Sequence, residues 1–304
     1  MEHMVSVVIV NYNTFKLTCS CIQSVIDRTF GVKYEIIVVD NASEECKPEQ
    51  FLTHFPQVKL VKNKQNLGFA KGNNKGIEHA QGEIILLLNS DTELLNDAIT
   101  IASNKLLSDE NIGVISGQLT YPDGQVQPVS GRFPNVKREI RELLRLNKRF
   151  NDKQRADYYL GAAFNHKTEK EVDWVWGAFF MFRKRDLKHF PGQKLHEDFF
   201  MYGEDVQWCY HFKKVVGKKI LYTPEPKVVH YLGGSSHDTD VEIRHLTRML
   251  PNEYRWMASV RGVWYAKLYY LVKALHHMSL RKKEELEKAR VFLSFARLNS
   301  PVNG

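Results

Sequence analysis

The feature that most limits the fold is a set of three short, almost wholly apolar runs rich in Val, Ile and Leu: 5–10 (VSVVIV), 35–39 (EIIVV) and 84–88 (IILLL). Such runs are typical of strands buried on both faces of a parallel sheet, whereas strands with one solvated face alternate. Helix-like stretches at 14–28 and 70–80 separate them. The sequence therefore predicts a doubly wound α/β fold, with a mostly parallel central sheet flanked by helices.

The remaining sequence predicts further strands and helices for this sheet and one long segment outside it. The other expected elements are strands at 58–61, 112–119 and 220–222, a strand-like run at 172–183, a turn and helix at 91–107, a loop at 187–202 and a helix at 203–216. Residues 121–170 begin rich in Pro and Gly and continue into a basic run. They predict a long surface excursion, partly mobile.

The charge is concentrated at one end of the chain. The net charge is +8, and residues 244–297 hold twelve Lys or Arg against four Glu, so the remainder is close to neutral. A nucleic-acid binder would more often spread basic residues over its reading surface, so we expect no nucleic-acid partner. The segment Arg255 to Arg297 also interleaves Trp and Tyr with its cations. This composition fits either an interfacial helix on an anionic membrane or a helical appendage that packs on the domain or on a second subunit of a homodimer.

The cysteines and the apolar runs bear on the compartment. Cys19, Cys21, Cys46 and Cys209 match neither a zinc pattern nor a disulfide framework, which favours a reducing compartment. Residues 5–10 are too short for a signal peptide, and no apolar run reaches the roughly 18–20 residues that span a bilayer. We therefore expect a cytoplasmic protein that can be peripheral on the inner face of the cell membrane.

Polar residues follow each predicted parallel strand, where ligands bind in open α/β sheets. These exits are Asn11-Tyr12-Asn13, Asp40-Asn41-Ala42-Ser43, Asn66-Leu67-Gly68 and Asn89-Ser90-Asp91. One such exit is ordinary turn chemistry, but four that converge indicate a site. Neither a GxGxxG nor a Walker pattern is present, which argues against a dinucleotide-dependent dehydrogenase and a P-loop kinase. A bound diphosphate would then be neutralised most simply by a cation with oxygen ligands.

Seven segments together resemble the family 2 glycosyltransferases, which have the GT-A fold. They are VSVVIVNYN at the start, IIVVDNAS at 36–43, NLGFAKGNN at 66–74, LLLNSD at 86–91, WGAFFMFRK at 176–184, HEDFFMYGEDVQWC at 196–209 and VVHYLGGSS at 228–236. Each is weakly specific alone, but their order and spacing over about residues 4–236 are strongly specific. The sequence is most similar to the rhamnosyltransferase-like subgroup, which builds bacterial surface polysaccharides. The resemblance implies a GT-A catalytic domain over 1–240 and a helical, basic C-terminal extension over 241–304.

The resemblance also implies a donor site. Asp40 would hydrogen-bond the base or ribose of the nucleotide, although a cap or turn role is the alternative. Trp176 and Gly177 resemble the lining of the sugar and acceptor pocket, although Trp176 could equally be a core residue. Lys71 could reach a phosphate or simply lie at the start of a helix. The other implied donor contacts are Asn11, Asn13, Asn66, Gly68, Asn73, Asn89 and Ser90.

The implied metal site departs from the family pattern. Asn89-Ser90-Asp91 stands where many members have Asp-x-Asp, and Asn offers a carbonyl oxygen without charge. Asp91 is therefore the expected ligand for Mg²⁺ or Mn²⁺, while Asn89 could contact sugar or ribose instead. His230 could complete the metal site, contact the diphosphate or be structural.

The pair Glu204-Asp205 is implied to contain the catalytic base, Asp205 more than Glu204. A carboxylate is needed to take the proton from the acceptor hydroxyl, and two adjacent acids raise each other's pKa. The alternative is that both acids stabilise a helix N-terminus.

The function that follows is an inverting hexosyl transfer from a nucleotide sugar to a saccharide or polyprenyl-linked saccharide. dTDP-rhamnose is the first donor expected, and UDP-galactose, UDP-glucose and UDP-N-acetylglucosamine are the alternatives. A nucleotidyltransferase would want a Gly- and Arg-rich loop after the first strand, which NYNTFK is not. A non-catalytic sugar-binding or membrane-docking module is the remaining rival, and the acids at 91, 204 and 205 argue against it.

Overall fold

The computed structural model describes residues 3–231 and 239–298, with the side chains of 239–242 not described. The strands are β1 Met4–Asn11, β2 Lys33–Asp40, β3 Lys59–Lys62, β4 Ile84–Asn89, β5 Thr92–Leu94, β6 Ile112–Thr120, β7 Ser130–Gly131, β8 Lys170–Val172, β9 Trp174–Val175, β10 Phe179–Arg183 and β11 Lys219–His230. The helices are α1 Phe15–Arg28, α2 Gln50–His54, α3 Gly68–Glu78, α4 Ala98–Ser108, α5 Val136–Leu143, α6 Asp152–Tyr159, α7 Glu204–Lys214, α8 Thr239–Arg261, α9 Val263–Ser279 and α10 Lys283–Ala296. Short 3₁₀ helices occupy Leu146–Arg149, Gly161–Ala163, Lys184–His189 and Pro191–Gln193.

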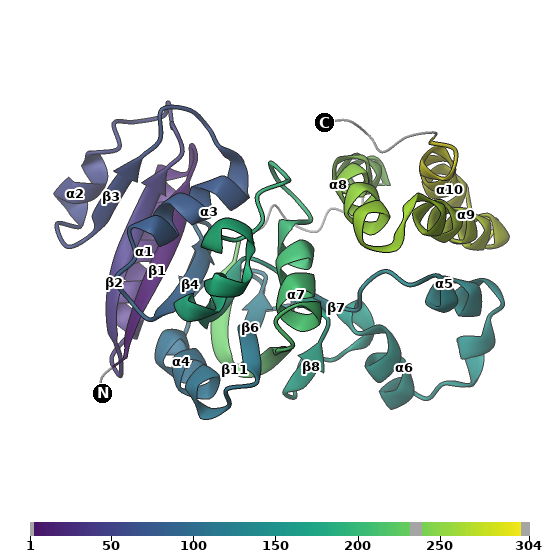
Figure 1. The fold of residues 1–304 in the computed structure, drawn as a ribbon, viewed down its shortest axis with the longest axis horizontal. Helices are drawn as coiled ribbons and strands as arrows, with labels where there is room; N and C mark the ends of the chain where they lie inside the picture. Colours follow the sequence, from purple (N-terminus) through teal and green to yellow (C-terminus); the bar gives the residue numbers. More distant parts are fainter. Residues whose placement is uncertain (1–2, 232–238, 299–304) are drawn as a thin grey trace. The chain divides into compact units, whose positions relative to one another are not determined.

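One large sheet organises the chain from Met4 to His230, with strand order β3-β2-β1-β4-β10-β6-β11-β5 and with β8 beside β11 (Figure 1). The strands β1, β2, β3 and β4 run parallel, and β11 runs parallel to β6. Between them β10 runs antiparallel to both β4 and β6. This is the predicted mostly parallel sheet, with β10 reversed at its centre and β5 and β8 antiparallel to β11 at its far side.

Helices cover both faces of the sheet because its connections wind in two directions. The chain moves one way from β1 to β2 and the other way from β3 to β4, so right-handed crossovers place α1 and α3 on opposite faces. Phe69 in α3 stacks on Trp208 of α7, which puts those two helices on one face. The Gly31 N–H, just after α1, donates to Thr100 of α4, which joins those two helices on the other.

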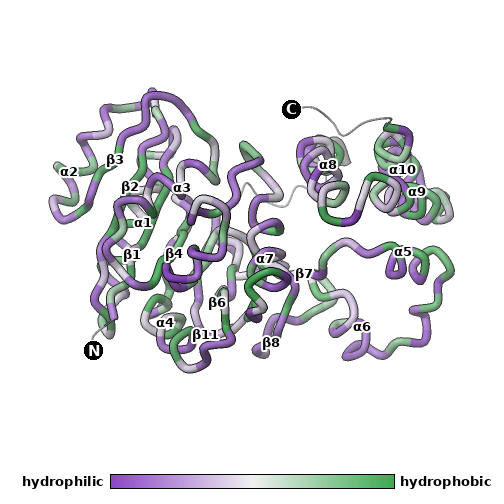
Figure 2. The backbone as a smooth tube through the Cα atoms, in the orientation of Figure 1, coloured by the Kyte–Doolittle hydropathy of each residue, from purple (hydrophilic) through white to green (hydrophobic). Residues whose placement is uncertain are grey.

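The core lies between these layers. Val7, Ile9, Ile37 and Leu87 are fully buried, as the uniformly apolar runs predict. Figure 2 shows hydrophobic residues concentrated along the central strands and hydrophilic residues in the loops around them. The doubly wound fold class predicted from these runs is confirmed.

Three predicted elements differ from the structure. The run 172–183 forms β8, β9 and β10 rather than one strand, because the chain bends at Asp173 and again at 176–178. The short strand expected at 220–222 is a twelve-residue strand, β11, whose pairing with β6 shifts register between Tyr222 and Lys227. The expected loop at 187–202 contains two short 3₁₀ helices.

The chain divides into two compact units, one of residues 1–132 and 159–234 and the other of residues 133–158 and 235–304. The excursion expected over 121–170 is thus split between them. Its first part is not superficial, since Gln127, Val129 and Ser130 are fully buried beside β6 and β9. Its middle part groups with the C-terminal helices, so the units do not divide simply at residue 240 as expected.

The second unit has its own aromatic core. Tyr254 of α8, Tyr270 of α9 and Phe295 of α10 lie within about 6 Å of one another, and all are buried. The helix α5 packs on α9 and donates its Val136 N–H to the hydroxyl of Tyr265. Within the described residues, no helix combines the length and the apolar character needed to cross a membrane.

Candidate active site

The carboxyl ends of β1, β2 and β4 meet at one edge of the sheet. The strand register pairs Asn11 with Asp40 on one side and Val10 with Asn89 on the other. The polar exits that the sequence singled out therefore lie side by side, as parallel strands require.

The exits of β1 and β2 are joined by a buried hydrogen-bond network. The Asn11 amide donates to Asp40 Oδ1 and to Ser43 Oγ, each at 2.9 Å, and the Ser43 N–H donates to Asp40 Oδ2 at 3.2 Å. Asn13 has a left-handed backbone, with φ of 52°, and accepts from the Glu44 N–H. Asn11 and Asp40 therefore shape the turn at this edge, and Asp40 is only 2 % exposed.

A second network holds the loop before α3. Asn41 donates to Asn66 Oδ1 at 2.9 Å and to the Gly68 carbonyl at 3.2 Å, and it accepts from Asn63 and the Leu67 N–H. Gly68 has φ of +80°, and a Cβ there would lie 2.2 Å from the Phe200 carbonyl oxygen. Only glycine fits this close approach. Sequence reasoning gave Asn41 no role of its own, although its place in the Asp-Asn-Ala-Ser exit was visible.

The side chains on α3 differ in their use. Asn73 is buried and donates within its helix to the Phe69 carbonyl. The Asn74 side chain holds a segment distant in sequence, because its amide donates to the Leu195 carbonyl and accepts from the Leu195 N–H. Lys71 is exposed, and none of the hydrogen bonds among the described residues joins it to the other predicted site residues.

The exit of β4 meets the end of β11. Asp91 Oδ1 lies 3.4 Å from Nε2 of His230, and the Asn89 amide donates to the same Nε2 at 3.3 Å. Ser90 contacts Thr14 through its hydroxyl, which ties this exit to that of β1. The structure thus brings together Asn89, Asp91 and His230, which lie 141 residues apart at the extremes.

His230 is buried and held in one tautomer by Gln127. The Gln127 amide donates to the His230 carbonyl and accepts from Nδ1 of its ring, both at 2.9 Å. Two contacts fix which end of this amide faces the ring. With the proton on Nδ1, the lone pair of Nε2 points toward Asp91 and Asn89. Sequence reasoning missed Gln127, because it lies in the segment that was expected to be a surface excursion.

These residues fit a divalent cation in part. Asn89 Oδ1 is buried without a hydrogen-bond partner, and it accompanies the carboxylate of Asp91 and the Nε2 lone pair of His230, which a cation would take over from the Asn89 N–H. Among the described residues, no group of three or more His, Cys, Asp or Glu is placed to hold a metal by itself. A cation here would need the amide oxygen of Asn89 and oxygens from a ligand as well.

The acidic pair opens helix α7 close by. Burial, and then the charge of Asp205, raise the pKa of Glu204 to about 8. Burial raises the pKa of Asp205 to about 6, against the opposing effect of N–H groups from Val206 and Gly177. Glu204 Oε2 is buried without a partner, whereas Asp205 keeps some exposure. Of the two, Asp205 is the better placed to exchange a proton with a bound molecule.

The segment Trp176-Gly177-Ala178 links the groups described above. The Trp176 ring lies edge-on to His230 with centroids 6.2 Å apart, the Gly177 N–H donates to Asp205 Oδ2 at 3.3 Å, and the Ala178 carbonyl accepts from the Asn89 N–H at 3.1 Å. A Cβ on Gly177 would lie 2.9 Å from the Phe69 ring. Residues 232–238, part of the motif at 228–236, lie outside the described residues.

The fold is shared with two solved glycosyltransferase structures. A mannosyltransferase from Pyrobaculum calidifontis, in complex with GDP-Man and Mn²⁺, aligns with a TM-score of 0.57 and 14 % identity over 97 % of this chain and 86 % of that chain. S. aureus TarS, residues 1–349, aligns with a TM-score of 0.54 and 14 % identity over 97 % of this chain and 90 % of that chain. The sheet order and its polar carboxyl edge are those of a GT-A glycosyltransferase fold.

Sequence comparison then gives the family. Residues 6–190 match Glycosyl transferase family 2, and the chain belongs to this family. Among similar proteins are a Neorhizobium galegae N-acetylglucosaminyltransferase (30 % identity over 33 % of this chain and 24 % of that protein) and the Pasteurella multocida chondroitin synthase (25 % identity over 56 % and 18 %). A third is Streptococcus pneumoniae glycosyltransferase GlyG, 27 % identical over 40 % of this chain and 42 % of that protein. The chain thus spans less than half the length of these relatives.

Proposed function

We propose that this chain transfers a sugar from a nucleoside diphosphate donor to a hydroxyl group, with inversion at the anomeric carbon. The observation that carries the proposal is the contact of one short segment, 176–178, with Asn89, His230 and Asp205. The same three residues therefore contact both the side of the site that would bind the diphosphate and the carboxylate that would take the proton. Membership of Glycosyl transferase family 2 supports the reaction class.

The nucleotide would lie along the exits of β1 and β2 and the loop before α3. Asn11 already donates to Asp40, and Asn66 already accepts from Asn41. A preorganised edge of this kind loses little further freedom when a ligand binds. We assign Asn13, Gly68, Asn73 and Ser90 to the same surface, and exposed Lys71 to the phosphates.

A divalent cation, Mg²⁺ or Mn²⁺, would be held by Asp91, Nε2 of His230 and Oδ1 of Asn89. When bound, it would offset the negative charge that develops on the departing diphosphate. The fit of the three donor atoms supports this assignment, as does the fold shared with a mannosyltransferase solved with Mn²⁺.

Asp205 would act as the general base. Its carboxylate is oriented by the N–H groups of Gly177 and Val206 and keeps lone pairs for an acceptor hydroxyl. Its raised pKa brings it close to the operating range of a base at neutral pH. Glu204 is more deeply buried and would supply local charge rather than contact the acceptor. Trp176 would offer one face to a pyranose ring.

The donor sugar and the acceptor are finer parts of the proposal. The motif resemblance puts dTDP-rhamnose first, with an acceptor in surface polysaccharide synthesis, on a saccharide or a polyprenyl-linked saccharide. UDP-galactose, UDP-glucose and UDP-N-acetylglucosamine are the alternatives, and the similarity to an N-acetylglucosaminyltransferase supports the last of these. A location on the inner face of the membrane and a homodimer through the basic helices stay predictions.

A thermal-shift screen of nucleotide sugars, with and without Mn²⁺, tests the donor. A specific donor should raise the melting temperature in proportion to its occupancy, and Mn²⁺ should enlarge the shift. Donors that bind are then offered with saccharide and lipid-linked acceptors, and the product and its anomeric configuration are read by NMR. Binding without turnover across the whole panel would favour the rival reading, a non-catalytic sugar-binding module.

A further inference from the structure

One face of α9 is apolar and lies open. Trp264 is 80 % exposed, and four further side chains on the same face are exposed by 41–46 %: Leu268, Leu271, Leu275 and Met278. Their spacing of four, three, four and three residues keeps all five on a single stripe about four turns long. Contiguous exposed stripes of large apolar side chains are uncommon on soluble surfaces and mark interaction sites.

The stripe does not belong to the core of its own unit. The opposite face of α9 fills that core with Ala266, Tyr269, Tyr270 and Ala274, all of them buried. The stripe borders a hollow of about 400 Å³ between α9 and α10. Apolar side chains of both helices form most of its lining, with Lys267 and Arg297 as its only charged groups.

Cations flank this stripe, and acids are absent from its helix. The sequence of α9 contains neither Asp nor Glu. Of its two lysines, Lys267 lies beside the stripe, whereas Lys273 lies on the opposite face and donates to the hydroxyl of buried Tyr269. Lys267 lies 4.9 Å from the centroid of the Trp264 ring, so the most exposed aromatic carries a cation beside it. At the far end, Arg281 and Lys282 follow the helix and are exposed. An apolar face with Trp at one end and cations along its sides is the pattern of a helix that lies in a membrane interface.

The spacing alone would also suit the same helix of a second copy, because heptad seams have this repeat. Charge decides between the two partners. Two copies would bring Lys267 and Arg297 of each chain together, with no acid on α9 to oppose them. Anionic headgroups would instead meet the cations while acyl chains meet the apolar floor of the hollow.

We propose that the α9 stripe, with the hollow between α9 and α10, docks the protein on a bilayer that contains anionic lipid. Docking would give the proposed transferase access to a lipid-linked acceptor, and only this purpose rests on the proposed function. Docking itself requires no donor, acceptor or metal, so it can be measured separately from transfer.

The test is flotation of the full chain with phosphatidylcholine vesicles, with and without phosphatidylglycerol. Binding should appear only with the anionic lipid and should weaken with added salt. Leu268→Gln with Leu271→Gln should lower the partition coefficient about ten-fold, because two apolar side chains no longer enter the interface. Lys267→Gln and Arg297→Gln should each lower it about five-fold.

Matched controls lie in the first unit. Leu52→Gln removes an equally exposed leucine from α2, and Lys47→Gln removes an exposed cation, and neither should change binding. All substitutions are at accessible positions, so unchanged circular dichroism melts should confirm folding. Wild-type protein that stays with the aqueous phase, or stripe variants that float like wild type, would overturn the proposal. A concentration-dependent dimer that the leucine variants abolish, seen by light scattering, would overturn it in favour of a second copy.

Discussion

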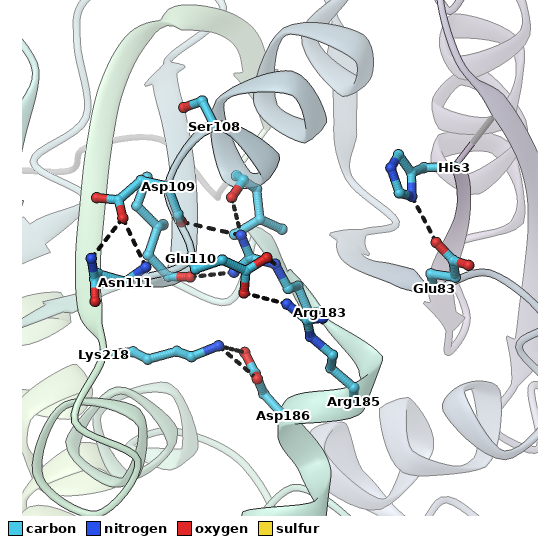
Figure 3. Close-up of polar contacts among 12 residues, drawn as sticks. His3, Glu83, Ser108, Asp109, Glu110, Asn111, Arg183, Arg185, Asp186 and Lys218 are labelled. Carbon is cyan, nitrogen blue, oxygen red and sulfur yellow. Dashed lines mark hydrogen bonds and ion pairs between the residues drawn. The ribbon is translucent and has the colours of Figure 1, made fainter. Parts of the chain in front are cut away.

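The two edges of the central sheet use polar residues in opposite ways. At the amino edge the charges are paired, as Figure 3 shows for Lys218 with Asp186, Arg185 with Glu110, and His3 with Glu83. Buried Arg183 donates there through its terminal nitrogens to the carbonyls of Ile112, Leu106 and Asp109, and its Nε lies 3.8 Å from Glu110. At the carboxyl edge Asn11 and Asp40 are paired as well, but among the described residues Asn89 Oδ1 and Glu204 Oε2 are buried with neither a hydrogen bond nor an opposite charge beside them.

This difference indicates that the amino edge of the sheet stabilises the fold and that the carboxyl edge binds a ligand. A buried polar group left unpaired costs free energy that a ligand can recover, whereas a paired group has nothing left to offer. Strand β10 accounts for the division. Because it runs antiparallel to its neighbours, 176–178 before it lies at the carboxyl edge and Arg183 at its end lies at the amino edge. The contrast predicts loss of activity from one edge and loss of stability from the other.

The largest effect is expected from Asp205→Asn. Loss of the general base should lower the rate of sugar transfer by about 10³-fold, within the usual range for such a group. Nucleotide binding, measured by calorimetry, should stay close to wild type, since the amide preserves the shape of the side chain. Asp198→Asn, in the loop before α7 and with an exposed side chain, is the control. Transfer at the wild-type rate would remove Asp205 from its assigned role.

The corresponding change at the amino edge is Arg183→Met. Its guanidinium is nearly fully buried, so its removal leaves backbone carbonyls of β6 and α4 unsatisfied. We expect the free energy of unfolding in urea to fall by about 1–3 kcal/mol for each carbonyl left unsatisfied. Arg185→Met, which removes the exposed partner of the same Glu110, should change it little. If Arg183→Met weakened donor binding in folded protein without affecting stability, the division between the edges would fail.

A smaller effect should follow from Gln127→Leu. Without the acceptor for its Nδ1 proton, His230 is no longer confined to the tautomer that leaves Nε2 free. Mn²⁺ affinity in the presence of UDP, measured by electron paramagnetic resonance, should fall by about 10- to 100-fold.

Gln127→Glu, which retains an acceptor for that proton, should preserve most of the affinity. Gln118→Leu, which removes a side-chain hydrogen bond from the neighbouring strand β6, should preserve it too. Equal losses in all three variants would mean that Gln127 acts only through folding.

The smallest effects concern pH. Asp205 must be ionised to act, so transfer should rise as the pH passes about 6 and then level off. The raised pKa of Glu204 means that its contribution to stability is complete below its ordinary pKa of 4.5 and is lost as the pH rises through about 8. The melting temperature of Glu204→Gln should therefore gain on wild type with rising pH. A difference that does not change with pH would show that Glu204 does not ionise in this range.

Much of the fold could be predicted because it depends on local patterns. The runs at 5–10, 35–39 and 84–88 are uniformly apolar, which only a strand covered on both faces tolerates, and they gave the parallel sheet. The division of 121–170 between two units could not be predicted. It depends on side chains such as Val129 and Phe133, whose burial is decided by distant helices and strands rather than by their neighbours in sequence.

The candidate site divides in the same way. The exits at Asn11, Asp40 and Asn89 were predictable, since parallel strands place their carboxyl ends together. The contact of Gln127 with His230 was not, because 103 residues separate them and only the pairing of the segment with β6 brings them close. Motifs identified the groups that would touch a ligand, whereas the residues that hold those groups carry no local signal.

Strand β10 also has a consequence for recombination between related sequences. Its five residues pair with β4 in one register, Phe179 with Leu88 through Arg183 with Ile84. A chimera that takes 84–89 from one parent and 176–183 from another must reproduce that register at both ends. A shift of one residue would exchange the side chains that pack against the two helical layers, and would move both Trp176 and Arg183 by about 3.3 Å along the strand. Crossover points should therefore fall outside these two segments, and a chimera should take both segments from the same parent.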